Sequence, residues 1–146
     1  MNESTVISEE FFSFLSGKAS TAISRRLQRN LKEVKLNITA EQWSILYYLW
    51  LEEGLTQQEL ANFTFRDKPS ITRLINNLER LGMVIRVNDK QDRRSNLIYL
   101  TKEGRKLRES GMKQASLTIR ESLEGVDETD LKIAQEILER VFQNLK

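Results

Sequence analysis

Apolar residues recur every three or four positions between residues 68 and 81, which predicts an amphipathic helix with one buried face. The positions on this face are Ile71, Leu74, Ile75, Leu78 and Leu81. Asp67 stands where an N-cap residue belongs, and Pro69 falls in the first turn, where the missing N–H has no intrahelical partner anyway. Gly82 suits the left-handed conformation that ends many helices. The sequence therefore predicts both ends of this helix.

The opposite face of the same helix is polar and basic. It carries Lys68, Pro69, Ser70, Thr72, Arg73, Asn76, Asn77 and Arg80, and its one carboxylate, Glu79, comes near the end. An α-helix fits the major groove of DNA, where Arg, Asn, Ser and Thr side chains can bind base edges or phosphates. These residues are therefore candidate DNA contacts. Taken alone, the helix is equally compatible with an ordinary amphipathic helix whose polar face is solvated.

The segments on either side complete a specific order of elements. Residues 57–63 predict a short helix, begun by a capping box at 56–59 and followed by a turn at 64–66. Residues 83–88 and 96–100 alternate as two strands of a hairpin. A helix, a turn, a second helix and a hairpin in this order predict a winged helix-turn-helix. Phe63 is expected to be buried in the short helix.

The connection between the two strands, residues 89–95, is too long and too charged for a tight turn. Candidate DNA-binding residues of this wing are Arg86, Lys90, Asp92, Arg93 and Arg94. A basic loop beside a recognition helix suits the minor groove, whose negative potential attracts arginine. Asp92 is two residues from Arg94 and can hold that guanidinium by a charge-assisted hydrogen bond. A solvated hairpin turn is the alternative interpretation of the same charges.

Outside residues 38–101 the pattern predicts long helices with apolar stripes, at 8–35, 102–123 and 127–145. A further, strongly apolar helix begins at the capping box Thr39-Ala-Glu-Gln42 and is expected at the centre of the lobe. The stripe of helix 102–123 includes Leu107, Gly111, Met112, Ala115, Ile119 and Leu123. The fold class expected is mainly α with a small β-wing, in a single domain covering 1–146.

The first and last helices have more apolar surface than this domain can cover. A helix of roughly 27 residues would span ~40 Å, which exceeds a small winged-helix core. A second subunit is the simplest partner for the excess, which makes 8–35 and 102–146 candidate dimerisation helices. The candidate interface residues are Phe12, Leu15, Leu138, Val141, Phe142 and Leu145. Complete burial of the first helix in its own domain remains the alternative.

The charge of the chain is concentrated in its middle. Residues 66–108 hold twelve Lys/Arg and five Asp/Glu, a net +7, whereas the rest of the chain is −5. This distribution favours a polyanionic partner for the middle segment. The chain has no Cys and no His, so the common nucleophiles, general bases and soft metal ligands are missing, and neither an enzyme, a metal nor a cofactor is expected. With no membrane-spanning or signal pattern, a cytoplasmic protein is expected.

The order of elements and two motifs resemble the MarR family of bacterial transcription regulators. Asp92-Arg93-Arg94, five residues, then Leu100-Thr101 and Gly104 match the family's wing pattern, D-x-R-x5-L-T-x-x-G. Segments 68–74 and 78–84 resemble its recognition-helix motif. The resemblance implies a homodimer bound to a pseudo-palindromic operator, most often as a repressor. It also implies that Arg94 enters the minor groove, that Asp92 positions it, and that Ser70, Thr72 and Arg73 contact bases or phosphates.

The resemblance further implies a small aromatic, anionic effector between the dimerisation helices and the lobe. Candidate lining residues are Phe14, Trp43, Tyr47 and Met112, and plain core packing is the alternative for all four. Peroxide-sensing members of the family use a cysteine, a switch that this sequence excludes. A winged-helix module that binds protein instead of DNA is the alternative function.

Overall fold

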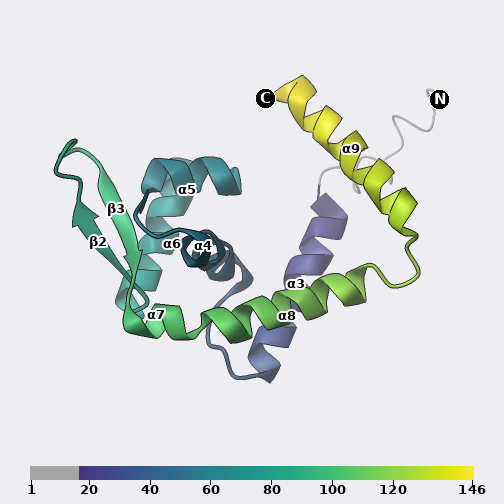
Figure 1. Ribbon diagram of the computed structural model, residues 1–146, viewed down its shortest axis with the longest axis horizontal. Coiled ribbons are helices and arrows are strands. Elements are labelled where there is room, and N and C mark those ends of the chain that lie inside the picture. The colour runs from purple at the N-terminus through teal and green to yellow at the C-terminus, as the bar shows by residue number, and fades with distance from the viewer. Residues whose placement is uncertain (1–16) are drawn as a thin grey trace.

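The computed structural model describes residues 17–146, which form mainly helices with a small sheet at one edge of the molecule (Figure 1). The helices are α3 (Ala19–Glu33), α4 (Ala40–Leu51), α5 (Gln57–Thr64), α6 (Lys68–Arg80), α7 (Lys102–Lys106), α8 (Arg108–Ser122) and α9 (Glu128–Leu145). The strands are β1 (Leu55–Thr56), β2 (Val84–Asn88) and β3 (Asn96–Leu100). This mainly α fold with a β-wing confirms the predicted fold class.

Capping side chains begin the helices of the lobe where the sequence predicts. Thr39 and Thr56 each form a complete capping box, with Gln42 and Glu59 respectively, at the starts of α4 and α5. Thr101 accepts from the N–H of Gly104 at the start of α7. These local hydrogen bonds satisfy backbone donors that a helix end leaves free. Short-range sequence signals therefore fix most of the element boundaries.

The sheet is antiparallel with the strand order β1-β3-β2. In the hairpin, Val84 pairs with Leu100 and Asn88 with Asn96, while Leu55 of β1 pairs with Ile98 on the other edge of β3. The side chains of Val84, Ile98 and Leu100, which belong to these strands, are buried in the core. The base of the wing is thus part of the core, and its outer end extends beyond the helices (Figure 1).

The apolar helix α4 lies at the centre of the lobe. Its residues Ile45, Leu46, Leu49 and Trp50 are buried, as predicted for a central helix. One continuous core joins them to α3, α5, α6 and the sheet. At roughly 25 cal/mol per Å² of apolar surface, burial of such side chains is the main stabilising contribution to the lobe.

Several expectations about the helices are wrong in detail. The helix expected at 102–123 is divided at Leu107 into α7 and α8. Phe63, Leu81 and Ile119 are exposed. Phe63 and Leu81 lie at the ends of α5 and α6. Ile119 is exposed because the buried face of α8 is formed instead by Gly111, Gln114 and Thr118. Helix α3 ends at Glu33 instead of residue 35. Residues 8–16 of the predicted first helix lie outside the described residues, as do Phe12, Phe14 and Leu15.

Polar side chains, two of them buried, join α3 to α8. Asn30 donates to Thr118 Oγ1 at 2.9 Å and to Glu121 Oε1 at 2.8 Å, and Arg26 forms an ion pair with Glu121 at 2.7 Å. The Asn30 hydrogen bond, with the nearby arginine, holds the pKa of Glu121 below its usual value. These bonds fix how α3 and α8 lie against each other. They connect α3, the described part of the predicted first helix, to α8, the helix that follows the winged helix-turn-helix.

Candidate nucleic-acid interface

Helix α6 presents one buried and one exposed face, as its sequence predicts. Ile71, Leu74, Ile75 and Leu78 are 0–2% exposed. Asp67 accepts from the backbone N–H of Ser70 at 2.7 Å, and this hydrogen bond lowers the pKa of Asp67 below its usual value. The cap therefore stays charged at the positive end of the helix dipole. The polar side chains of α6 are therefore exposed or half-buried, while its apolar face is buried.

The exposed face of α6 is a continuous polar surface. Lys68, Pro69, Thr72, Arg73, Asn76, Asn77 and Arg80 line one shallow depression on it, and Ser70 is half-buried beside the cap. Arg80 donates to Asn77 Oδ1 at 2.8 Å, and Arg73 lies 3.7 Å from Glu41 of α4. The Arg73 side chain is still 62% exposed, so this weak ion pair leaves it accessible. All eight predicted recognition-helix residues therefore lie on or beside one exposed surface.

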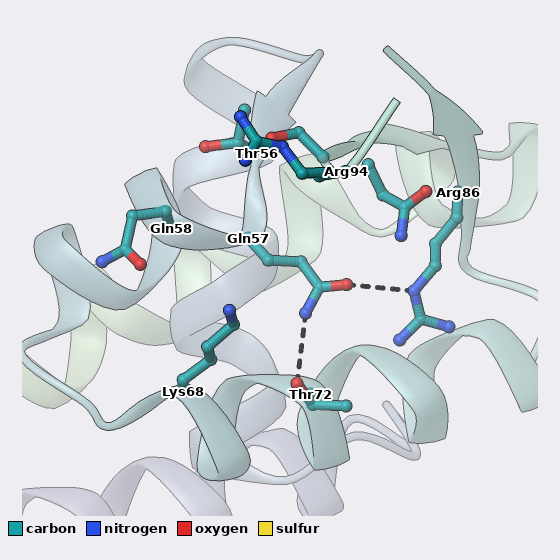
Figure 2. A pocket seen from close by; sticks show the side chains of 9 residues that line it. Thr56, Gln57, Gln58, Lys68, Thr72, Arg86 and Arg94 are labelled. Atoms are coloured by element: carbon teal, nitrogen blue, oxygen red, sulfur yellow. Dashed lines mark hydrogen bonds between the residues drawn. The ribbon is translucent and has the colours of Figure 1, made fainter. Parts of the chain in front are cut away.

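A groove lies between this helix and the wing (Figure 2). It encloses about 470 Å³ and is lined by Thr56, Gln57, Gln58, Lys68, Thr72, Arg86, Arg94, Ser95 and Asn96. Three of these side chains are cationic and the others are neutral and polar. A groove with hydrogen-bonding groups and an excess of positive charge favours an anionic, hydrogen-bonding ligand. Recognition helix and wing thus form one surface.

The outer end of the wing carries Arg94 in an exposed, partly held position. Its side chain is 92% exposed, and its Nε donates to Asp92 Oδ1 at 3.3 Å. The same carboxylate oxygen also accepts the backbone N–H of Arg94 at 3.1 Å. Asp92 therefore shapes the turn and points the guanidinium, as the sequence predicts. Lys90 and Arg93 are also exposed on this loop.

Arg86 differs from the other predicted wing residues, because its guanidinium faces the protein. It lies on β2 with only 20% of its side chain exposed, and it donates to Glu79 Oε1 at 2.9 Å. It also donates to Asn76 and, at 3.2 Å, to Gln57 Oε1. Arg86 thus joins the wing to α5 and α6.

Comparison with known proteins agrees with this geometry. Residues 36–95 match the model of the MarR family. The organic hydroperoxide resistance transcriptional regulator of Bacillus subtilis (strain 168) is 33% identical over 93 residues, 62% of this chain and 63% of that protein. The regulator FarR of Neisseria gonorrhoeae is 40% identical over 73 residues, half of each chain. The chain thus matches less than two thirds of the length of these curated relatives.

Solved structures resemble the chain over nearly its whole length. The S. aureus MepR–DNA complex aligns with a TM-score of 0.81 and 28% identity, and the alignment covers 92% of this chain and 98% of MepR. Over residues 36–95 the chain matches the MarR family, and its fold is that of MarR-family regulators. This match confirms the resemblance drawn from the wing and recognition-helix motifs, and the fold agrees with it outside the matched segment as well.

The effector residues expected by resemblance to the MarR family are only partly brought together. Trp43 and Tyr47 stack with ring centroids 5.2 Å apart and line a small cavity of about 290 Å³. Met112 does not line this cavity but packs against the core from α8, and Phe14 lies outside the described residues. Arg66 lines the cavity, and its buried Nε has no hydrogen-bond partner among the described residues.

The predicted interface residues of α9 form an exposed apolar face. Leu138, Val141, Phe142 and Leu145 are 36–80% exposed, and no residue of α9 is buried. An apolar helix face of this extent is typical of protein interfaces.

Within residues 17–146, no helix could cross a membrane and no group of three or more His, Cys, Asp or Glu could hold a metal ion.

Sequence reasoning missed the contribution of α5 to the groove. Gln57 and Gln58 at its start line the groove beside α6, and Ser95 and Asn96 line it from the wing. The capping box located the start of α5, but the box does not show which side chains of its first turn face the next helix. Only the crossing of α5 and α6 in the folded chain decides that.

Proposed function

We propose that this chain is a transcriptional regulator that binds a specific double-stranded DNA operator. The observation that carries the proposal is the joined surface of α6 and the wing, where an exposed polar helix face lies beside a cationic groove and Arg94. An α-helix of this kind fits the major groove, and a projecting arginine fits the minor groove. The similar S. aureus protein MepR was solved as a complex with DNA, which supports DNA as the partner of this fold.

We further propose that the functional unit is a homodimer acting as a repressor at a pseudo-palindromic operator. The exposed apolar face of α9 supports association through this helix. In a two-fold dimer the two recognition helices would enter major grooves about 34 Å apart, one helical turn of DNA. The dimer therefore sets the spacing of the half-sites.

Selection of bound sequences from a random duplex pool with purified protein tests this proposal. An enriched inverted repeat with half-sites about one helical turn apart is the expected result. Affinity for the selected site should fall by ~10³-fold or more between about 50 and 200 mM salt, because several phosphate contacts release counterions. Weak binding without enrichment, from a folded dimer, would instead favour a winged helix that binds a protein partner.

We also propose that a small aromatic carboxylate binds in the cavity beside Trp43 and Tyr47. Arg66 lines the cavity, with its Nη1 3.5 Å from Glu41 Oε2, and the positive charge of its guanidinium supports an anionic ligand. The stacked rings support an aromatic one. A ligand that changes the spacing of the two recognition helices would weaken operator binding, and operator and ligand would then weaken each other by the same factor.

Titration with benzoate, monitored by tryptophan fluorescence, tests the cavity. The chain has two tryptophans, so Trp43→Phe should remove the signal change while Trp50→Phe retains it. A saturable change that is insensitive to the Trp43 substitution would place the ligand elsewhere.

A further inference from the structure

Three polar side chains from three elements form a hydrogen-bonded chain at the floor of the groove (Figure 2). Arg86 Nε on β2 donates to Gln57 Oε1 on α5 at 3.2 Å. Gln57 Nε2 donates in turn to Thr72 Oγ1 on α6 at 3.2 Å. The chain therefore runs from the wing, through the first turn of α5, to the centre of the recognition helix.

The direction of every proton in this chain follows from its first member. A guanidinium has five N–H donors and no acceptor, so the atom of Gln57 that faces Arg86 must be the carbonyl oxygen. The amide NH₂ group then faces Thr72 and can only donate, which makes Thr72 Oγ1 the acceptor of that bond. The Thr72 hydroxyl is left with its own proton to donate. No described atom accepts that proton, and the hydroxyl lies at the wall of the groove.

The other bonds of Arg86 hold its guanidinium in place, so the direction of the hydrogen bonds from Arg86 through Gln57 to Thr72 is fixed. Besides Gln57, its guanidinium binds Glu79 at 2.9 Å and Asn76, both on α6. Four-fifths of its side chain is buried among these partners. The multiple charge-assisted bonds restrain the guanidinium plane, and the plane in turn orients the Gln57 amide. Without this restraint, a glutamine amide could present either end to Thr72.

We infer that Arg86 is a positioning residue which, acting through Gln57, makes Thr72 a hydrogen-bond donor toward DNA. This inference rests on the proposed function. The partner of Thr72 is then an acceptor: a base-edge atom such as purine N7, guanine O6 or thymine O4, or a phosphate oxygen. A donor at this position discriminates against the exocyclic amino groups of adenine and cytosine, which would face it as donors. Arg86 therefore contributes to sequence preference without contacting DNA.

The test compares two variants that carry the same charge change in neighbouring positions. Gln57→Glu replaces the amide by a carboxylate, which can only accept hydrogen bonds. The Thr72 hydroxyl would then donate its proton to this carboxylate, and the lone pairs of the hydroxyl oxygen would face the groove. Gln58→Glu adds the same charge one residue away, where the side chain bonds Asn62 instead of Thr72. Each substitution is also made together with Thr72→Val, which removes the hydroxyl at nearly constant shape. Affinity is measured for the selected operator and for a scrambled duplex.

The expected result is a coupling that only the Thr72 hydroxyl can produce. With Thr72 present, Q57E should bind the operator about 3- to 10-fold more weakly than Q58E, the usual range for one lost hydrogen bond. In the T72V background, Q57E and Q58E should bind equally. Loss confined to the operator would place the acceptor on a base, and equal loss on both duplexes would place it on a phosphate. A difference between Q57E and Q58E that persists in T72V would overturn the inference.

A second measurement separates failure of the inference from failure of the proposed function. The side-chain amide resonances of Gln57 should shift in T72V and in Arg86→Gln, and should not shift in Gln58→Glu, all without DNA. Unshifted resonances in the first two variants would overturn the inference even if the protein binds its operator. Absence of any salt-dependent DNA binding by the unsubstituted protein would overturn the proposed function itself, and the role of Thr72 with it.

Discussion

The indole N–H of Trp50 donates to the main-chain oxygen of Gly104 at 2.9 Å, inside the joint between the central helix and the helix that follows the wing. A second contact of the same kind lies seven residues earlier on α4, where Trp43 Nε1 donates to the oxygen of Gly111 on α8 at 3.0 Å. A Cβ on Gly104 would lie 2.2 Å from the Met83 oxygen, and one on Gly111 would lie 2.5 Å from the Trp50 ring. Gly111 thus lets α8 approach α4 closely, and Gly104 lets α7 approach the backbone just before β2.

Gly104→Ala is expected to destabilise the protein by about 2–3 kcal/mol, since the added methyl group meets backbone that cannot move aside cheaply. Urea unfolding monitored by circular dichroism gives the change in the free energy of unfolding. Lys113→Ala, on the exposed side of α8, is the matched control and should change stability by less than about 0.5 kcal/mol. A Gly104→Ala protein as stable as this control would show that α7 can shift away from β2.

Trp50→Phe is expected to cost about 1–3 kcal/mol, because it leaves a buried carbonyl without its donor. Among residues 17–146, Trp50 supplies a donor to the Gly104 oxygen at the point where α7 ends at Lys106 and α8 begins at Arg108. Trp43→Phe should cost less, because Trp43 is half-buried and water can reach the Gly111 oxygen. Urea unfolding of both variants checks this order, and equal losses would contradict it.

Local signals in the sequence predicted most of the lobe. Capping side chains at Thr39, Thr56 and Asp67 placed the helix starts, and alternation placed both strands within a residue of their observed ends. Such features depend on neighbours within four residues, so one sequence is sufficient to find them. The helix break at Leu107 lies beside a hydrogen bond from Trp50, more than fifty residues away in sequence, to Gly104, and the pattern of α7 and α8 alone could not show such a contact.

Local patterns in the sequence also predicted part of the candidate site. Exposure of the polar face of α6 followed from its periodicity. The inward orientation of Arg86 did not, because its partners Gln57, Asn76 and Glu79 come from two other elements. A basic residue on a predicted wing strand looks like a DNA contact until the crossing of α5 and α6 is known. Long-range polar contacts of this kind are what sequence periodicity leaves undetermined.

Arg94→Ala is expected to weaken operator binding by ~1–3 kcal/mol without unfolding the protein, because the Arg94 side chain is 92% exposed and, among the described residues, bonds only Asp92. Asp92→Asn should have a smaller effect, since it loosens the arginine without removing it. Fluorescence anisotropy with the selected operator measures both affinities, and sizing by light scattering verifies the oligomeric state. Normal binding by the Arg94 variant would remove the wing from the mechanism.

Acid should destabilise the protein partly through Glu53. The side-chain hydrogen bonds of Arg105, at 2.9 and 3.0 Å, together with the N–H of Leu100, hold the pKa of Glu53 below its usual value. A depressed folded-state pKa means that this stabilisation is present above the unfolded-state pKa and is lost as pH falls through the folded one. Glu53→Gln should therefore cost about 1 kcal/mol near neutral pH and less in acid.

Urea unfolding of the two proteins from neutral pH down to about 3 measures this convergence. The variant should keep some acid sensitivity, because the pKa values of Asp67 and Glu121 are also lowered by hydrogen bonds in the folded state. A constant difference between the Glu53→Gln variant and the unsubstituted protein across this range would assign the effect to packing and not to the charge of Glu53.

Leu138→Glu is expected to convert a dimer into a monomer, because it places a charge in the centre of the exposed apolar face of α9. Gln135→Glu puts the same charge on the polar face of the same helix and should leave the dimer intact. Sedimentation velocity at several concentrations distinguishes the two. Since each half-site binds one lobe, the Leu138 variant should also lose most of its operator affinity while its weak non-specific binding persists. If Leu138→Glu remained dimeric, α9 would lie outside the interface, and the spacing of the recognition helices would have to be set by other parts of the chain.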